Sequence, residues 1–176
     1  MVAIPRVAFL AFVANREFAA TLIPGLLVLM AAGSVPLWVL WRRKVDRRRT
    51  ETQVPLGNPF ELQEALRFGA FFVAVVYVVH QARELMGPQG LYVASSLAGI
   101  ADLDAITLSL SSMVPSAVGA NEGAAAVILA VNVNNIVKLL LALVRGSPEY
   151  RRLTLFGMSG LLLGGALVQL MMLPFS

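Results

Sequence analysis

Cysteine is absent from this chain, and histidine occurs once, as His80. Without cysteine there is no disulfide framework, no thiolate nucleophile and no cysteine-ligated metal site. The sequence also contains no phosphate-binding loop, no G-x-S-x-G nucleophile elbow, no H-E-x-x-H zinc motif and no dinucleotide-binding fingerprint. We therefore expect a protein that is not an enzyme and that needs no cofactor.

Charged residues are scarce, at 14% of the sequence against 58% hydrophobic residues, and the mean hydropathy is +0.77. Soluble domains carry about 25% charged residues. The apolar residues are gathered into runs of roughly 20, the length that an α-helix needs to cross a bilayer. The composition predicts an all-α, polytopic transmembrane helical bundle whose main partner is the lipid bilayer.

The formal net charge of +4 does not indicate nucleic acid as a partner, because the basic residues cluster beside an apolar run at 41–49. Such a cluster is typical of a cytoplasmic anchor that meets anionic lipid headgroups. We therefore expect residues 42–57 to form a cytoplasmic basic loop, and the protein to lie in the inner membrane of a bacterium or archaeon.

Turn signals divide the chain into about five spans and a short leading helix. The leading apolar stretch, 7–14, is too short to cross a bilayer alone. We treat residues 1–176 as a single membrane domain. The expected spans are 18–41, 64–86, 91–113, 122–144 and 153–174.

Strict alternation of these spans places Arg145, Arg151 and Arg152 outside, which conflicts with the excess of basic residues expected in cytoplasmic loops. One interpretation is that 91–113 is a discontinuous helix that enters the membrane and returns near Gly99. The other is that the larger basic cluster alone sets the orientation. We favour the second, because the 23 residues of 91–113 are enough to span.

Several polar side chains fall inside the expected spans. A charged residue there costs roughly 2.5 to 3.5 kcal/mol, so it must face protein or water. We expect an ion or proton site in which Lys138 is the counter-charge to one aspartate and the remaining oxygens suit Mg²⁺, Na⁺ or a proton relay. A closed polar network that only fixes helix register is the alternative. The candidate residues are Asp102, Asp104, Thr107, Asn134, Asn135 and Lys138.

The last span carries Gly157, Gly160 and Gly164, a small-residue pattern that marks close helix packing within the chain or with another subunit. A second hypothesis follows, in which the chain is a non-transporting regulatory subunit that docks onto a partner membrane protein or a second copy. Transport requires Asp102 or Asp104 to meet an aqueous path. Docking requires an exposed groove of small residues.

Three sequence features then point to a family. They are Asn58-Pro59-Phe60, the string G-I-A-D-L-D-A-I-T-L-S at 99–109, and Asn134 with Lys138. With them the chain resembles domain of unknown function 4010, which is commonly the C-terminal membrane domain of MgtC/SapB-type proteins. The resemblance covers nearly the whole chain and implies a polytopic membrane domain of unassigned activity. It also implies an MgtC/SapB-type partner domain associated with magnesium homeostasis and with regulation of membrane ATPases.

The family pattern includes an earlier segment, G-L-x-S-S-T-A-x-T, that resembles a distant repeat of the aspartate string. This sequence has neither that segment nor an MgtC/SapB-type domain. We therefore expect it to correspond to a family member that begins partway through the pattern.

Overall fold

A computed structural model describes residues 3–42 and 62–172, and all regular secondary structure in these residues is helical. One element, α3, holds two helices joined at Gly87, whose φ of 60° and ψ of −144° are not helical. The predicted basic loop, from residue 43 on, and the Asn58-Pro59-Phe60 helix start lie outside the described residues. The elements are α1 Ala3–Ala14, α2 Arg16–Arg42, α3 Leu62–Ala101, α4 Leu103–Met113, α5 Ala120–Arg145 and α6 Pro148–Met172.

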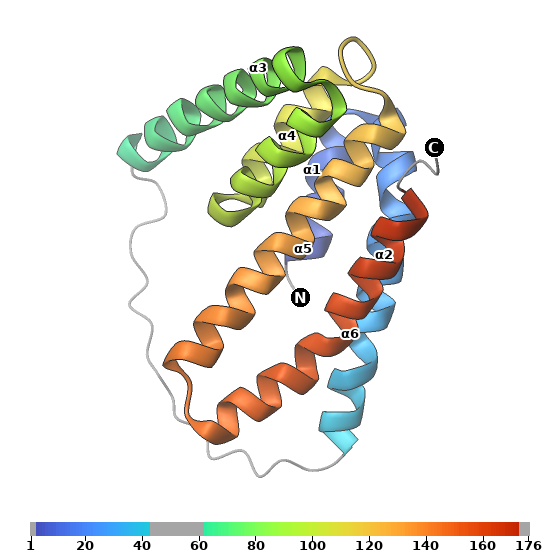
Figure 1. Cartoon of the computed structure of the whole chain (residues 1–176), viewed down its shortest axis with the longest axis vertical. Coiled ribbons are helices and arrows are strands. Elements are labelled where there is room, and N and C mark those ends of the chain that lie inside the picture. The colour runs from blue at the N-terminus through green and yellow to red at the C-terminus, as the bar shows by residue number, and fades with distance from the viewer. Residues whose placement is uncertain (1–2, 43–61, 173–176) are drawn as a thin grey trace.

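Three helices, α2, α5 and α6, are long and apolar enough to cross a membrane. They lie side by side through the length of the molecule (Figure 1). The prediction of a helical membrane protein is confirmed by these three, while the predicted number of about five spans is not.

Glycines bring α2 and α6 close together. A Cβ atom on Gly160 would overlap with the Ala32 carbonyl oxygen, and one on Gly164 would lie 2.6 Å from the Ala32 Cβ. Because lipid offers no hydrophobic drive between helices, such backbone proximity is the usual source of helix association in a membrane. We call this contact the α2–α6 seam. Gly157 is looser, since its Cβ would meet only Leu40 Cδ1 at 3.9 Å.

The segment predicted to cross as one span, 91–113, is interrupted at Asp102. This residue is extended, with φ −155° and ψ 121°, and α4 begins after it with only 11 residues. Residues 88–101 and α4 are therefore two half-length arms, which we call the hairpin, and we call residues 99–104 the hairpin tip. The arms pack against each other and against α5 (Figure 1).

The first arm begins, and the second arm ends, at the same end of the bundle. Arg83, just before the first arm, forms an ion pair with Glu122, just after the second. The tip lies deep inside, where a Cβ on Gly99 would come 2.6 Å from the Ala130 carbonyl oxygen. The expectation of one continuous helix over 91–113 is therefore wrong, and a discontinuous helix near Gly99, as in the interpretation that we did not favour, matches the structure.

The tip reaches the middle of the bundle. Asn134 of α5, which contacts it, lies about 21 Å along a helix of about 39 Å, taking 1.5 Å per residue. The short helix α1 runs beside α4, with Arg6 near the tip and Asn15 near the other end of α4. Thus α1 and both hairpin arms extend through only about half of the bundle.

The hairpin also brings to one end of the bundle the basic residues that strict alternation had separated. The last turn of α2, at Arg42, and the connection between α5 and α6 lie at one end of the bundle (Figure 1). Consequently Arg42, Arg151 and Arg152 gather at this end, which we call the basic end. The hairpin opens toward the opposite end.

Candidate functional site

The break in the hairpin leaves backbone groups that have no partner within either helix. The Asp102 carboxylate accepts a hydrogen bond from the Asp104 backbone N–H at 2.8 Å and so caps α4. The Asn134 side-chain Nδ2 donates to the Gly99 carbonyl oxygen, also at 2.8 Å. Two of the predicted residues therefore hold the hairpin tip in place.

Asp104 pairs with Arg6 of α1, whose Nε lies 2.9 Å from Asp104 Oδ1. The Asp104 side chain is 18% exposed and that of Arg6 is 57% exposed. Lys138 was predicted to be the counter-charge to one aspartate, but the cation beside Asp104 is Arg6. The signal was present, because Arg6 is the one charged residue in the otherwise apolar helix α1.

Thr107 is fully buried on α4, and its Oγ1 donates to the Leu103 carbonyl oxygen at 2.7 Å. Its proton therefore stays within the helix, although lone pairs of the hydroxyl oxygen remain. Asn134 is 8% exposed, and its Oδ1 has no hydrogen-bond partner. A buried amide oxygen without a donor is costly, and so it is a good acceptor for a cation or a protonated group.

The charges at the tip sum to one net negative charge, since Arg6 offsets one of the two aspartates. Within residues 3–42 and 62–172, no group of three or more His, Cys, Asp or Glu side chains could hold a metal ion. The arrangement of two carboxylates, one guanidinium and an unpartnered amide oxygen therefore suits a single positive charge.

The other two predicted residues lie in a different place. Asn135 and Lys138 line a cavity of about 700 Å³ between α5, α6 and the last turns of α2. Among the ion pairs of the described chain, none includes Lys138. Of the polar residues predicted to share one face of α5, Asn134 contacts the hairpin tip, whereas Asn135 and Lys138 line the cavity.

Polar residues that the sequence analysis did not use close the open end of the hairpin. Asn15 Nδ2 donates to the carbonyl oxygens of Ser111 and Val114, at 3.3 and 2.9 Å. The ion pair between Arg83 and Glu122 lies at the same end and is about three-quarters buried, at 24% and 21% exposure. Both contacts join segments far apart in the sequence, so no local pattern indicates them.

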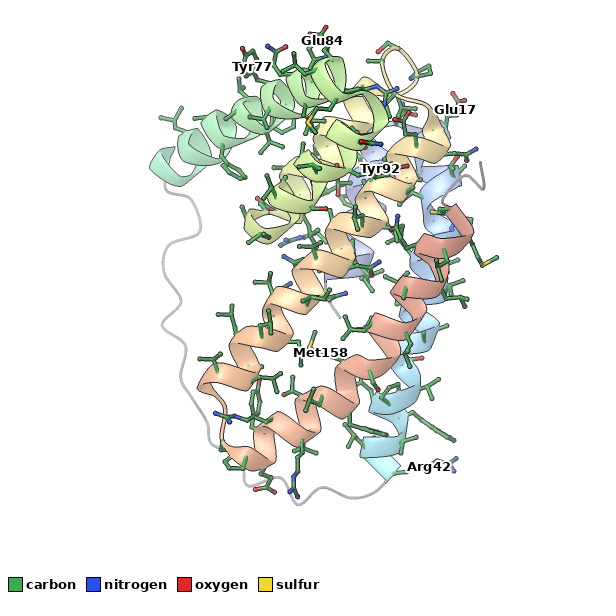
Figure 2. All side chains as sticks on the ribbon, viewed as in Figure 1. Glu17, Arg42, Tyr77, Glu84, Tyr92 and Met158 are labelled. Carbon is green, nitrogen blue, oxygen red and sulfur yellow. The ribbon has the colours of Figure 1, made fainter. Side chains whose placement is uncertain are left out.

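Some of the side chains labelled in Figure 2 lie at the two ends of the bundle. Figure 2 shows Glu17, Tyr77 and Glu84 at the end toward which the hairpin opens, and Arg42 at the basic end. Two acidic side chains, Glu17 and Glu84, thus lie at the end of the bundle opposite Arg42.

Comparison with known proteins shows a family for this chain. An uncharacterized protein of Aquifex aeolicus (strain VF5) is 35% identical over 102 residues, which are 57% of this chain and 44% of that protein. No solved structure matches the chain. The family model described as "Domain of unknown function (DUF4010)" matches residues 1–146. The chain therefore belongs to the DUF4010 family.

Proposed function

We propose that this membrane protein handles a single monovalent cation, H⁺ or Na⁺, at the hairpin tip. Asp102 and Asp104 supply the carboxylates, Arg6 supplies the counter-charge, and the Asn134 amide oxygen completes the site. The observation that carries the proposal is the meeting of two half-length helices at two aspartates, midway along the bundle. Interrupted helices with charged residues at mid-depth are typical of ion and substrate sites in transporters.

A purely structural network needs fewer charges than this tip contains. Capping the break requires one acceptor at Asp102 and one donor at Asn134, and both are in use. The Asp104 side chain caps nothing, yet its charge has to be matched by Arg6. Apolar residues would stabilise the same packing at least as well as a desolvated ion pair. The additional carboxylate therefore favours an ionic function.

The charge balance favours a monovalent ion over Mg²⁺. A divalent cation at a site with one net negative charge would remain undercompensated, and Mg²⁺ gives up its water ligands reluctantly. This distinguishes the tip from the magnesium-related role that the family resemblance implies for an MgtC/SapB-type partner. We propose transport or ion homeostasis, and not catalysis, as the role of the chain.

For orientation, we propose that the basic end faces the cytoplasm and that the hairpin enters from the opposite side of the inner membrane. The supporting observation is that the basic residues of α2 and α6 lie together at one end. The competing role, docking of a partner through α6, has less support, because Gly160 and Gly164 already pack against α2.

The test is flux into proteoliposomes under separate pH, Na⁺ and Mg²⁺ gradients. Asp104→Asn and Asp102→Asn are compared with wild type; asparagine is also a good N-cap residue, so the second variant keeps the cap on α4. Lys138→Met is the control, since it removes an intramembrane charge away from the tip.

We expect proton or sodium flux that falls at least tenfold in both aspartate variants and persists in the control. Size-exclusion profiles must match wild type for the comparison to count. Absence of flux in wild type, flux indifferent to both aspartates, or flux of Mg²⁺ alone would overturn the proposal.

A further inference from the structure

The cavity that contains Lys138 adjoins the hairpin tip at Leu103 but has a different chemistry. It lies between α5 and α6, where Figure 2 shows the Met158 side chain, and it extends toward the basic end. Its volume of about 700 Å³ falls in the range of roughly 300 to 1,000 Å³ that is usual for small-ligand sites. The lining residues include Leu37, Leu40, Val131, Lys138, Met158 and Leu161.

Most of the lining is aliphatic, and its polar members are few. They are Asn135, Lys138, Tyr150 and Thr154, each of which can donate a hydrogen bond, and the described lining includes no carboxylate. A cavity with one lysine and no acidic residue repels cations. It therefore suits neither the ion of the hairpin tip nor a cation path leading to it.

An unpaired ammonium group within a membrane protein is costly unless it reaches water or an anion. Lys138 can place its methylene groups along the apolar wall and its charge near a polar headgroup. The site thus combines an apolar volume with a positive charge.

We propose that this cavity binds an amphiphile with an apolar chain and an anionic headgroup, of the long-chain fatty acid class, with Lys138 as the partner of the headgroup. The aliphatic lining takes the chain, and Asn135 and Thr154, which line the same cavity, can donate hydrogen bonds to a carboxylate. The inference does not depend on the ion site, because the groups that would hold the ligand, Lys138, Asn135 and Thr154, lie outside the hairpin tip, which borders the cavity only through Leu103.

The probe is a palmitate analogue with a photoactivatable diazirine, added to the full chain in nanodiscs of zwitterionic phosphatidylcholine. After illumination, mass spectrometry maps the labelled peptides. We expect label on the peptide that carries Met158 and Leu161, displaced by oleate and much less by oleyl alcohol, which has the same chain without the charge.

Two variants test the two parts of the site, each with a matched control. Gly157→Leu fills the cavity, because a Cβ there meets nothing closer than 3.9 Å, and Gly69→Leu adds the same side chain where nothing lies within 4 Å. Lys138→Met removes the charge, and Arg152→Gln removes an exposed charge that does not line the cavity.

We expect at least fivefold less labelling in Gly157→Leu and Lys138→Met, and wild-type labelling in both controls. Displacement by phosphatidylglycerol as well as by oleate would identify a membrane lipid as the source of the same chemistry. Equal displacement by oleyl alcohol and oleate, or unchanged labelling in Gly157→Leu, would overturn the proposal.

Discussion

The α2–α6 seam and the hairpin tip both hold helices together inside the bundle, but they do so by opposite means. In the seam, both helices run on without a break, although Pro36 of α2 has no N–H to donate, and glycines let the two backbones approach until Gly164 nearly contacts Ala32. At the tip, the helices are broken, and side chains such as Asp102 and Asn134 replace the lost backbone partners. Lipid supplies neither hydrogen bonds nor a hydrophobic drive between helices. Close backbone packing therefore stabilises the unbroken helices, and polar side chains stabilise the broken ones.

The largest loss of stability should come from placing a bulky side chain in the α2–α6 seam. Gly160→Leu would force its side chain into the Ala32 carbonyl and the Pro36 ring, so we expect a loss of about 3 kcal/mol of unfolding free energy. Titration with sodium dodecyl sulfate, followed by circular dichroism, measures it. Gly157→Leu on the same helix is the control and should change little. Equal effects of the two variants would show that the seam is not the tight contact.

The next largest loss of stability should follow from breaking the ion pair at the hairpin tip. Arg6→Gln leaves the Asp104 carboxylate without its cation, and we expect a loss of about 2 kcal/mol, smaller than for a fully buried pair because Arg6 is half-exposed. The double variant with Asp104→Asn should recover much of that loss. A double-mutant cycle on unfolding free energies measures the coupling. Additive effects would mean that the two side chains do not interact in the membrane.

A smaller loss is expected at the end of the first hairpin arm. Asn134→Ala removes the donor to the Gly99 carbonyl oxygen, which costs about 1 to 2 kcal/mol when the acceptor stays buried. Hydrogen exchange of the amides near Gly99 should rise in this variant. Asn121→Ala, an exposed position on the same helix, is the matched control. Unaltered exchange near Gly99 would place the support of the tip elsewhere.

The smallest effect concerns the cap of α4. Asp102→Ala should cost about 1 kcal/mol through the lost N-cap, whereas Asp102→Asn should retain nearly all of the stability. The same detergent titration resolves the pair. If Asn proves as destabilising as Ala, then the charge of Asp102 matters to folding and not only its hydrogen bond.

Much of the architecture can be predicted from the sequence, because the lengths of the apolar runs indicate which helices can span a membrane. Apolar runs long enough to span predict α2, α5 and α6, and the polar residues of 99–109 predict that this segment is unusual. Length cannot separate one crossing from a hairpin of two half-helices, because both use the same number of residues. The backbone of one residue, Asp102, decides between them.

The residues of the candidate site also divide into those that could be predicted from the sequence and those that could not. Asp102, Asp104 and Asn134 could be predicted because charged and amide side chains inside a membrane must face protein or water. The position of Arg6 beside Asp104 depends on α1 packing against α4, a contact between residues 98 positions apart. Lys138 shares a helical arc with Asn134, but it lies four residues further along α5. It therefore lines the cavity, whereas Asn134 contacts the hairpin tip. The basic residues after α5 were the sequence signal that favoured re-entry.

The half-length of the hairpin arms has a consequence for how the protein is made. An arm of 11 residues is too short to remain across a bilayer by itself, and its tip exposes two carboxylates. Its partners at the tip include Ala130 and Asn134, which leave the ribosome only after the hairpin has been synthesised. The hairpin therefore settles into the bilayer together with α5, and the order of synthesis makes α5 the helix on which membrane insertion of the tip depends.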